Sequence, residues 1–406
     1  MKKGILLIMM LAVGMGGEAQ TAYISSFDNI VDVIDVATNF ITHTISVGMS
    51  PMGICVSPDG NKVYVANWEG ASISVINTTT NHVSATIPVG NSPIGVCVSP
   101  NGSRVYVANE LSYTVSVINS ISNTVMDSII VGTRPWAIAI SPDGNRVYVT
   151  NDLDSSVSVI NTASNTVIAT IPVGAFPCAV AVSHDNNKVY VANCGYYSPS
   201  PQGSISVISG SSNSVSDSIM TGGNPYGLVF SSDGNFLYEA NWGTNSVNVI
   251  DVATNSVVDE ISIGSYPVGI SITPDGSKLF VVNYGSGTVN VISAVTNTVI
   301  DTITVDGGPT ALGNFISIYP EHAGYASPCI VSSNISIYPN PANNNLTIET
   351  PQTSKIEIST IHGQLIKTLA STGTKTNIDV SEFPSGVYIV EVKTGKRIAI
   401  KKFVKE

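Results

Sequence analysis

Large aromatic side chains are the groups in this chain best suited to contacting a ligand, because they give rigid contact area with a polar edge. The chain has only three tryptophans among 406 residues. All three fall at two positions of a sequence repeat that opens with a proline, Trp136 at position 2 and Trp68 and Trp242 at position 18. A fold that brings these two positions together therefore creates a candidate binding surface.

Groups suited to catalysis are harder to find. The five histidines are scattered, and none shares a repeat position with a tryptophan; they are His43, His82, His184, His322 and His362. The chain has no glycine-rich phosphate loop, no paired cysteines with zinc-ligand spacing and no serine in a nucleophile-elbow motif. We therefore predict no catalytic residue, no metal site and no cofactor, and an enzyme is the less favoured alternative.

The repeat predicts the fold. Seven prolines open units of 42 residues, or of 48 in one case; they are Pro51, Pro93, Pro135, Pro177, Pro225, Pro267 and Pro309. Each unit has four short runs rich in Val, Ile, Thr and Tyr, separated by turn sequences such as Ser-Pro-Asp-Gly, and almost no helical spacing of apolar residues. A fixed period of this kind predicts an all-β propeller with one four-stranded blade per unit.

The ends of the repeat region determine the number of blades. Residues 22–47 supply a second, third and fourth strand without a first, and the segment that begins at Pro309 supplies a first strand with nothing after it. We predict that these two fragments form one blade. The result is a seven-bladed ring closed by both chain ends, with no long exposed sheet edge.

Positions 2 and 18 become neighbours in such a ring, because the loops entering the first strand and those joining the second to the third emerge on one face. Position 2 holds Thr310, Met52, Ile94, Trp136, Cys178, Tyr226 and Val268, and position 18 holds Phe27, Trp68, Glu110, Asp152, Cys194, Trp242 and Tyr284. The six-residue insertion of the long unit, within residues 195–202, rises from the same face.

We predict that this face binds a sugar or a peptide, because aromatic rings with a few charged groups suit both. The predicted ligand-binding residues are Phe27, Trp68, Glu110, Arg134, Trp136, Asp152, Tyr226, Trp242 and Tyr284. The alternative is that these side chains pack on one another and plug the mouth of the channel.

Glu239 breaks the repeat, because every other unit has an apolar residue at its position, such as Val65 or Val191. A carboxylate in this slot must be paired, protonated or exposed, since burial of an unpaired charge costs on the order of two or more kcal/mol. Cys178 and Cys194 hold positions 2 and 18 of one unit and are candidates for a disulfide, with two free thiols as the alternative.

The N-terminus has the three regions of a secretory signal peptide. Lys2 and Lys3 precede an apolar run from Ile5 to Val13, and Gly17-Glu18-Ala19 follows it before Gln20. This run is too short for a stable membrane span. We predict a signal peptide at residues 1–19 and no transmembrane segment in the mature protein.

Four second strands carry a shared motif. Val63–Asn67, Val105–Asn109, Val147–Asn151 and Val189–Asn193 resemble the YVTN-type β-propeller repeats of bacterial and archaeal surface proteins, and the resemblance covers roughly residues 20–319. The resemblance implies a propeller. It leaves the activity open, because the family includes binding, scaffolding and a few enzymatic roles.

From about Ser336 the repeat stops and lysine becomes frequent. Residues 337–348, 361–366 and 383–392, with the terminal Lys401–Lys405, resemble the C-terminal sorting domain of type IX secretion, over residues 335–406. Its strand and turn pattern predicts a small β-sandwich, joined to the propeller by a linker at residues 320–334. The resemblance implies contact with the type IX secretion machinery and passage through the periplasm to the outside or the outer cell surface.

Charge separates the two parts. The propeller segment has six basic residues against 20 acidic ones, so nucleic acid is excluded as a favoured partner. Five of the six bases hold one repeat position after the first turn, and we interpret them as a solvated rim; they are Lys62, Arg104, Arg146, Lys188 and Lys278.

Together these features predict a secreted or surface-displayed binding or adhesion module that recognises a glycan or a protein through its aromatic face. One alternative is a structural surface-layer component with no discrete ligand. The other is a lyase or hydrolase that works at the channel mouth.

Overall fold

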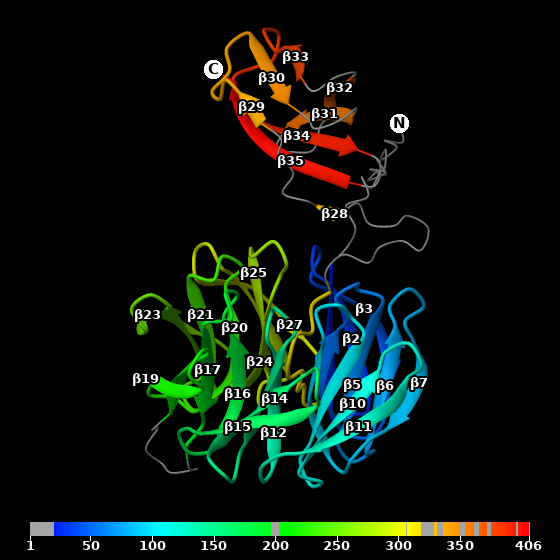
Figure 1. Cartoon of the computed structure of the whole chain (residues 1–406), viewed down its shortest axis with the longest axis vertical. Coiled ribbons are helices and arrows are strands. Elements are labelled where there is room, and N and C mark those ends of the chain that lie inside the picture. The colour runs from blue at the N-terminus through cyan, green and yellow to red at the C-terminus, as the bar shows by residue number, and fades with distance from the viewer. Residues whose placement is uncertain are drawn as a thin grey trace, which may run out of the picture. The chain divides into compact units, whose positions relative to one another are not determined.

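The computed structural model describes residues 20–195, 203–305, 307–317, 329–330, 336–349, 354–360, 365–371, 375–394 and 397–405. These residues form strands and turns and no helix. The chain divides into two compact units, Met1–Pro320 and Glu321–Glu406 (Figure 1). The predicted signal peptide, most of the insertion at residues 195–202, and His322 and His362 lie outside the described residues.

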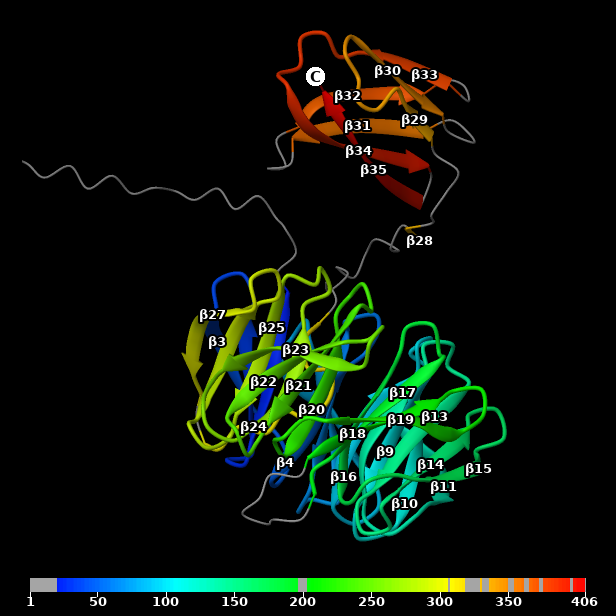
Figure 2. The same cartoon turned by 90° about the vertical axis from the view of Figure 1, so that its left-hand side faces the viewer.

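The first unit is a ring of seven antiparallel sheets that follow one another in chain order (Figures 1 and 2). Blade 1 contains β1 (Thr21–Ser26), β2 (Ile30–Asp35) and β3 (Phe40–Ser46). Blade 2 contains β4 (Pro51–Val56), β5 (Lys62–Asn67), β6 (Ser72–Asn77) and β7 (His82–Pro88). Blade 3 contains β8 (Pro93–Val98), β9 (Arg104–Asn109), β10 (Thr114–Asn119) and β11 (Thr124–Ile130). Blade 4 contains β12 (Pro135–Ile140), β13 (Arg146–Asn151), β14 (Ser156–Asn161) and β15 (Thr166–Pro172).

The remaining three blades repeat this order. Blade 5 contains β16 (Pro177–Val182), β17 (Lys188–Asn193), β18 (Ser204–Ser209) and β19 (Ser214–Met220). Blade 6 contains β20 (Pro225–Phe230), β21 (Phe236–Asn241), β22 (Ser246–Asp251) and β23 (Ser256–Ser262). Blade 7 contains β24 (Pro267–Ile272), β25 (Lys278–Asn283), β26 (Thr288–Ser293) and β27 (Thr298–Thr304). Six of the seven predicted opening prolines begin a first strand, and Pro309 begins the closing segment.

The predicted closure of the ring by both chain ends is confirmed. The segment after Pro309 lies along β1, with bridges that join Ser26 to Pro309 and Ala22 to Ile316. The amide of Thr310 donates to the carbonyl of Ser25 at 2.8 Å, and the amide of Tyr23 donates to the carbonyl of Phe315 at 2.9 Å. This segment therefore supplies the innermost strand of blade 1, and the seven-bladed all-β prediction is correct.

The five repeated bases join neighbouring blades, which the interpretation as a solvated rim missed. Lys62 Nζ donates to the carbonyl of Ser120 at 2.5 Å, from blade 2 to blade 3. Lys278 Nζ donates to the carbonyl of Val36 at 2.9 Å, from blade 7 to blade 1. The other three bonds follow the same direction around the ring; they join Arg104 to Thr162, Arg146 to Gly210 and Lys188 to Val252.

The first strands crowd around the central axis, and this explains the small residues there. A Cβ at Gly53 would lie 1.9 Å from the carbonyl oxygen of Ile94 in the next blade, and one at Gly269 would lie 2.2 Å from that of Ala311. Such distances exclude any side chain without a shift of the backbone. The inward side chains of these strands line a central cavity.

One asparagine ends the second strand in each of blades 2 to 7; these are Asn67, Asn109, Asn151, Asn193, Asn241 and Asn283, and all are buried. Asn109 Nδ2 donates to Thr114 Oγ1 at 3.1 Å and to Ser116 Oγ at 2.9 Å, both on the third strand. A glycine of the loop entering the blade rests on the same side chain, because a Cβ at Gly90 would lie 2.7 Å from Asn109 Cγ. The asparagine therefore holds the loop against the hairpin.

The second unit is a small two-sheet β domain. One sheet contains β29 (Ser336–Tyr338), β30 (Asn345–Glu349) and β33 (Lys375–Asp379). The other contains β28 (Cys329–Ile330), β31 (Ser354–Thr360), β32 (Leu365–Ser371), β34 (Gly386–Thr394) and β35 (Arg397–Lys405). Its core includes Tyr388 stacked on Phe403, with ring centroids 5.3 Å apart. The prediction of a second, small β domain is confirmed.

We predict that Asn109→Ala lowers the free energy of unfolding by about 2 kcal/mol, because the hydroxyls of the buried Ser116 and the half-buried Thr114 lose their shared donor and Gly90 loses its support. Urea unfolding of the mature protein measures the change. Asn91→Ala is the control, since Asn91 is exposed on the loop beside this site, and its effect should stay below about 0.5 kcal/mol. Equal losses in the two variants would contradict the role given to Asn109.

Candidate functional site

Backbone hydrogen bonds hold two loops together on one face of every blade. The amide at position 18 donates to the carbonyl of the residue before the opening proline, from Trp68 to Ser50 at 3.0 Å for example. The same bond joins Phe27 to Gly308, Glu110 to Ser92, Asp152 to Arg134, Cys194 to Phe176, Trp242 to Asn224 and Tyr284 to Tyr266. We call the residues before the proline, at position 2 and at position 18 of the seven blades the variable rim.

The residue before the proline adopts a left-handed backbone in most blades. Its φ is 56° at Arg134, 54° at Phe176 and 55° at Tyr266. Bulky residues seldom adopt this conformation, and such local strain gathers at functional sites. The rim therefore carries a third set of side chains that the spacing of positions 2 and 18 does not predict.

Charged residues occupy the rim of blades 3 and 4, and Trp68 of blade 2 contacts one of them. Arg134 lies between two largely buried carboxylates, with Nη2 2.7 Å from Glu110 Oε1 and Nη1 3.3 Å from Asp152 Oδ2. Its guanidinium also lies over the ring of Trp136, with Cζ 5.8 Å from the ring centroid. Trp68 Nε1 donates to the other oxygen of Glu110 at 2.7 Å. The structure thus brings five of the predicted residues into one cluster.

The two carboxylates in this cluster share one cation. Burial raises the pKa of Asp152, the charge of Arg134 lowers it, and the charge of Glu110 raises it again, and the net shift is upward. Both oxygens of Glu110 already accept hydrogen bonds from Arg134 and Trp68. The exposed part of the guanidinium is therefore the polar group in this cluster with the most free surface, since its side chain is 31% exposed.

Aromatic residues occupy the rim of blades 6, 7 and 1. Trp242 lies among three tyrosines, stacked on Tyr266 at 4.7 Å and on Tyr284 at 5.9 Å between centroids, and tilted against Tyr226 at 5.4 Å. Phe27 meets Tyr284 edge to face at 6.0 Å. The ring of Trp242 is therefore largely covered, and Tyr266 and Tyr284, which are 47% and 39% exposed, form the outer surface of the aromatic cluster.

Sequence reasoning missed Tyr266, because this residue precedes the opening proline and only the left-handed backbone turns its ring onto Trp242. Trp68, one of the predicted ligand-binding residues, also lies apart from the aromatic cluster. Within the described residues no ring contact joins Phe27 to Trp68, whose indole contacts Glu110 instead. The sequence did carry a signal for Tyr266. It is a bulky residue directly before the opening proline, where two other blades have Ser50 and Ser92.

A disulfide lies between the two clusters. Cys178 and Cys194 are bonded, with their Cα atoms 6.3 Å apart, at positions 2 and 18 of blade 5. The side chains of Trp136 and Tyr226 pack against this pair from blades 4 and 6, and their rings meet edge to face at 6.4 Å. All nine residues predicted for ligand binding thus contact at least one other member of the set. The packing that we gave as the alternative is present as well.

Glu239 lies between blades 5 and 6 and has no exposed surface. Its Oε2 accepts hydrogen bonds from Asn248 Nδ2 at 2.9 Å and from Asn241 Nδ2 at 3.3 Å. Burial raises the pKa of Glu239 to about 7, and the hydrogen bonds oppose this shift only in part. The carboxyl group is therefore neither exposed nor paired with a cation, and it is half protonated near neutral pH.

The glutamate complements a second departure from the repeat. Asn248 replaces the serine found at its position in blades 2 to 5, such as Ser116, and its extra donor needs an acceptor. In blade 7 the equivalent Asn290 donates to Thr302 at 2.8 Å on the fourth strand. In blade 6 the residue paired with Asn248 on the fourth strand is Glu260. Asn248 instead donates to Glu239, which lies on the second strand. Since Asn241 directly precedes Trp242, this network lies beneath the aromatic cluster.

The remaining candidate groups lie elsewhere. His43 and His82 are exposed on fourth strands, and His184 is exposed beside Phe230, where it lines one end of the central cavity. In the part of the chain that the structure describes, no three His, Cys, Asp or Glu side chains gather to hold a metal ion. None of the described residues belong to a helix long and apolar enough to cross a membrane.

Two protein families match the chain. The family described as "Lactonase, 7-bladed beta-propeller" matches residues 77–195 and 131–300, which together cover more than half of the chain. The "Secretion system C-terminal sorting domain" matches residues 336–406. No match was found among curated proteins.

Solved structures with a similar fold are numerous. Hydrazine synthase from Kuenenia stuttgartiensis is 22% identical, with a TM-score of 0.61 over 64% of this chain and 88% of that one. A functionally unknown protein from Desulfotomaculum acetoxidans is 17% identical, with a TM-score of 0.64 over 73% of this chain and 100% of that one. At these identities the likeness concerns the fold alone.

We predict that Glu239→Gln raises stability more at alkaline than at acidic pH. The folded pKa of about 7 exceeds the ordinary value of 4.5, so the folded state holds its proton longer than the unfolded state. The stability of the natural protein therefore falls as the pH rises from the unfolded-state pKa of 4.5 to the folded-state pKa of about 7. Between about pH 5 and about pH 8, the gain in unfolding free energy from the substitution should grow by about 2.5 kcal/mol.

Urea unfolding at the two pH values measures this difference. Glu260→Gln is the matched control, because Glu260 is an exposed carboxylate on the neighbouring strand, and its effect should stay below about 0.5 kcal/mol at both values. An effect of Glu239→Gln that is the same at both pH values would refute the raised pKa.

Proposed function

The chain belongs to the family of lactonase-type seven-bladed β-propellers, and from this premise we propose that it is an exported binding module that recognises a glycan or a protein through its variable rim. The sorting domain at residues 336–406 indicates export by type IX secretion to the cell surface or the extracellular space. Residues 335–406 would contact the secretion machinery, and residues 20–319 would meet the ligand.

The observation that carries the proposal is the aromatic cluster on one side of the rim. Tyr266 and Tyr284 offer exposed rings that Trp242 stacks against from within, so their orientation is fixed before a ligand arrives. Rigid aromatic anchors lose little conformational freedom on binding and dominate the energy of many interfaces. Such a surface suits the apolar face of a sugar ring or an exposed side chain of a protein.

The charged cluster would add specificity. Arg134 is held by Glu110, Asp152 and the ring of Trp136, so its exposed guanidinium edge is fixed in position. A guanidinium in a fixed orientation recognises carboxylate and other planar acceptor groups well. We propose that the aromatic cluster supplies most of the affinity and that Arg134 selects ligands with an acceptor group.

Intrinsic tryptophan fluorescence tests the proposal, because Trp68, Trp136 and Trp242 are the only tryptophans and all lie on this rim. The mature protein is titrated with a panel of polysaccharides and of matrix proteins. We expect a saturable change in emission with at least one of them. In Tyr266→Ala and Tyr284→Ala the affinity for that ligand should fall about tenfold, because each variant removes one exposed ring.

Phe40→Ala is the control, since Phe40 is highly exposed on β3 and lies outside the variable rim. Its affinity should equal that of the natural protein. No change in tryptophan emission with any member of the panel would favour the structural surface-layer alternative. A titration that the tyrosine variants leave unchanged would place the binding site elsewhere.

A hydrolase is the second candidate, and the lactonase family match is the observation that favours it. Asp152 would be its general base, because the pKa of this carboxyl is raised and it lies 3.3 Å from a cation that could hold an oxyanion. Under the binding proposal we expect no turnover of simple lactones or aryl esters, measured by proton release. Turnover that Asp152→Asn reduces at least about a hundredfold would replace the binding proposal with this one.

A further inference from the structure

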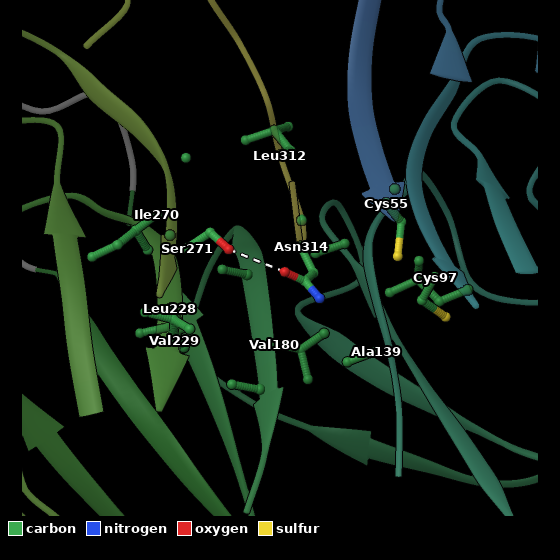
Figure 3. A pocket seen from close by; sticks show the side chains of 18 of the residues that line it. Cys55, Cys97, Ala139, Val180, Leu228, Val229, Ile270, Ser271, Leu312 and Asn314 are labelled. Carbon is green, nitrogen blue, oxygen red and sulfur yellow. Dashed lines mark hydrogen bonds between the residues drawn. The ribbon is translucent and has the colours of Figure 1, made fainter. Parts of the chain in front are cut away.

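The centre of the propeller contains a cavity of about 580 Å³. Its wall is built from the first strands of the blades and from the closing segment around Leu312 and Asn314, and Figure 3 shows these side chains pointing inward. Most of them are small or apolar, among them Cys55, Cys97, Ala139, Val180, Leu228 and Ile270. Pockets for small molecules have volumes and linings of this kind.

Few polar groups interrupt the wall. The lining includes no Asp, Glu, Lys or Arg; its hydroxyl and imidazole groups belong to Ser57, His184, Tyr226, Ser232, Ser271 and Thr273. Asn314 is the only amide in the lining, and the closing segment carries it into the cavity beside Ser271, where it is exposed. Burial of an ionic ligand against such a wall would leave its charge unpaired, which costs several kcal/mol.

The amide of Asn314 has a fixed orientation. Its Oδ1 accepts a hydrogen bond from Ser271 Oγ at 3.1 Å, so its Nδ2 points away from Ser271 and into the cavity (Figure 3). No described residue accepts a hydrogen bond from this Nδ2. The wall therefore has one donor that faces the cavity without a protein partner, Asn314 Nδ2, which is free to donate a hydrogen bond to an oxygen of a ligand.

We infer that the central cavity binds a neutral, largely apolar small molecule whose carbonyl oxygen accepts a hydrogen bond from Asn314 Nδ2. The apolar body of the ligand would fill the space between Cys97, Ala139 and Leu228. This site is separate from the exposed tyrosines of the variable rim, and the inference does not depend on the proposed function.

The thiols of the wall support reversible binding over covalent capture. Burial raises the pKa of Cys55 to about 12 and holds that of Cys97 well above its ordinary value. Both groups are therefore protonated at neutral pH, and the protonated thiol is a poor nucleophile. They act as small apolar parts of the lining.

Prodan is a suitable probe, because it is a neutral naphthalene with one carbonyl oxygen, and its emission shifts to the blue in apolar surroundings. Titrated with the mature protein, it should show saturable binding with a blue shift. In Ala139→Phe the affinity should fall at least about tenfold, since the new ring occupies the cavity. Ala163→Phe is the matched control, because it adds the same ring at an exposed turn, and its affinity should be unchanged.

Asn314→Leu tests the donor without filling the cavity. The affinity for prodan should fall about three- to tenfold, as expected for one lost neutral hydrogen bond. The emission of bound prodan should shift further to the blue, because its carbonyl loses a donor. Circular dichroism verifies the fold of each variant.

The outcomes separate clearly. Absence of saturable binding to the natural protein overturns the inference. Equal affinities of Ala139→Phe and Ala163→Phe place prodan outside the cavity and overturn it as well. Binding that Ala139→Phe abolishes and Asn314→Leu leaves unchanged in affinity and colour keeps the cavity but refutes the role of Asn314.

Discussion

The binding face depends on the hydrogen bonds of the buried asparagine that ends the second strand in blades 2 to 7. In blade 3 Asn109 binds two hydroxyls of the third strand and supports Gly90 of the entering loop. The next residue, Glu110, donates its amide to Ser92, which precedes the opening proline. One buried side chain thus fixes the start of both loops that carry the variable rim. The rim can therefore differ in every blade while the backbone beneath it stays the same.

This arrangement explains where the repeat tolerates departures. The slot of Glu239 is apolar in the other blades, and a carboxyl group survives there because Asn248 and Asn241 donate to it. In blade 7 the equivalent asparagine needs no acidic acceptor, because Asn290 donates a hydrogen bond to the hydroxyl of Thr302. The replacement of serine by Asn248 on the third strand is thus compensated by Glu239 on the second strand, which ends at the rim. The compensation leaves blade 6 with a titratable group directly beneath Trp242.

Much of the fold could be predicted because the period of the prolines fixes the strands and the turn residues fix their ends. The joint blade followed from a missing strand at one end and a surplus strand at the other. The orientation of side chains could not be read in this way. Tyr266 reaches Trp242 only through a left-handed backbone, and the indole N–H of Trp68 donates its hydrogen bond to Glu110 of the next blade, away from the aromatic residues. Both outcomes depend on distances between blades, which a sequence period does not contain.

The distribution of titratable groups bears on what the propeller does. Hydrolysis requires a group that changes protonation near neutral pH where the substrate lies. Among the described residues, two carboxyls have a raised pKa: that of Asp152, which Arg134 holds on the rim, and that of Glu239, which is fully buried. The central cavity is lined by protonated thiols and a neutral amide, Asn314, with the imidazole of His184 at one end. This lining suits a neutral, largely apolar molecule. The rim, in contrast, presents fixed aromatic rings and a fixed cation, Arg134, so the two surfaces differ in the ligand chemistry that they suit.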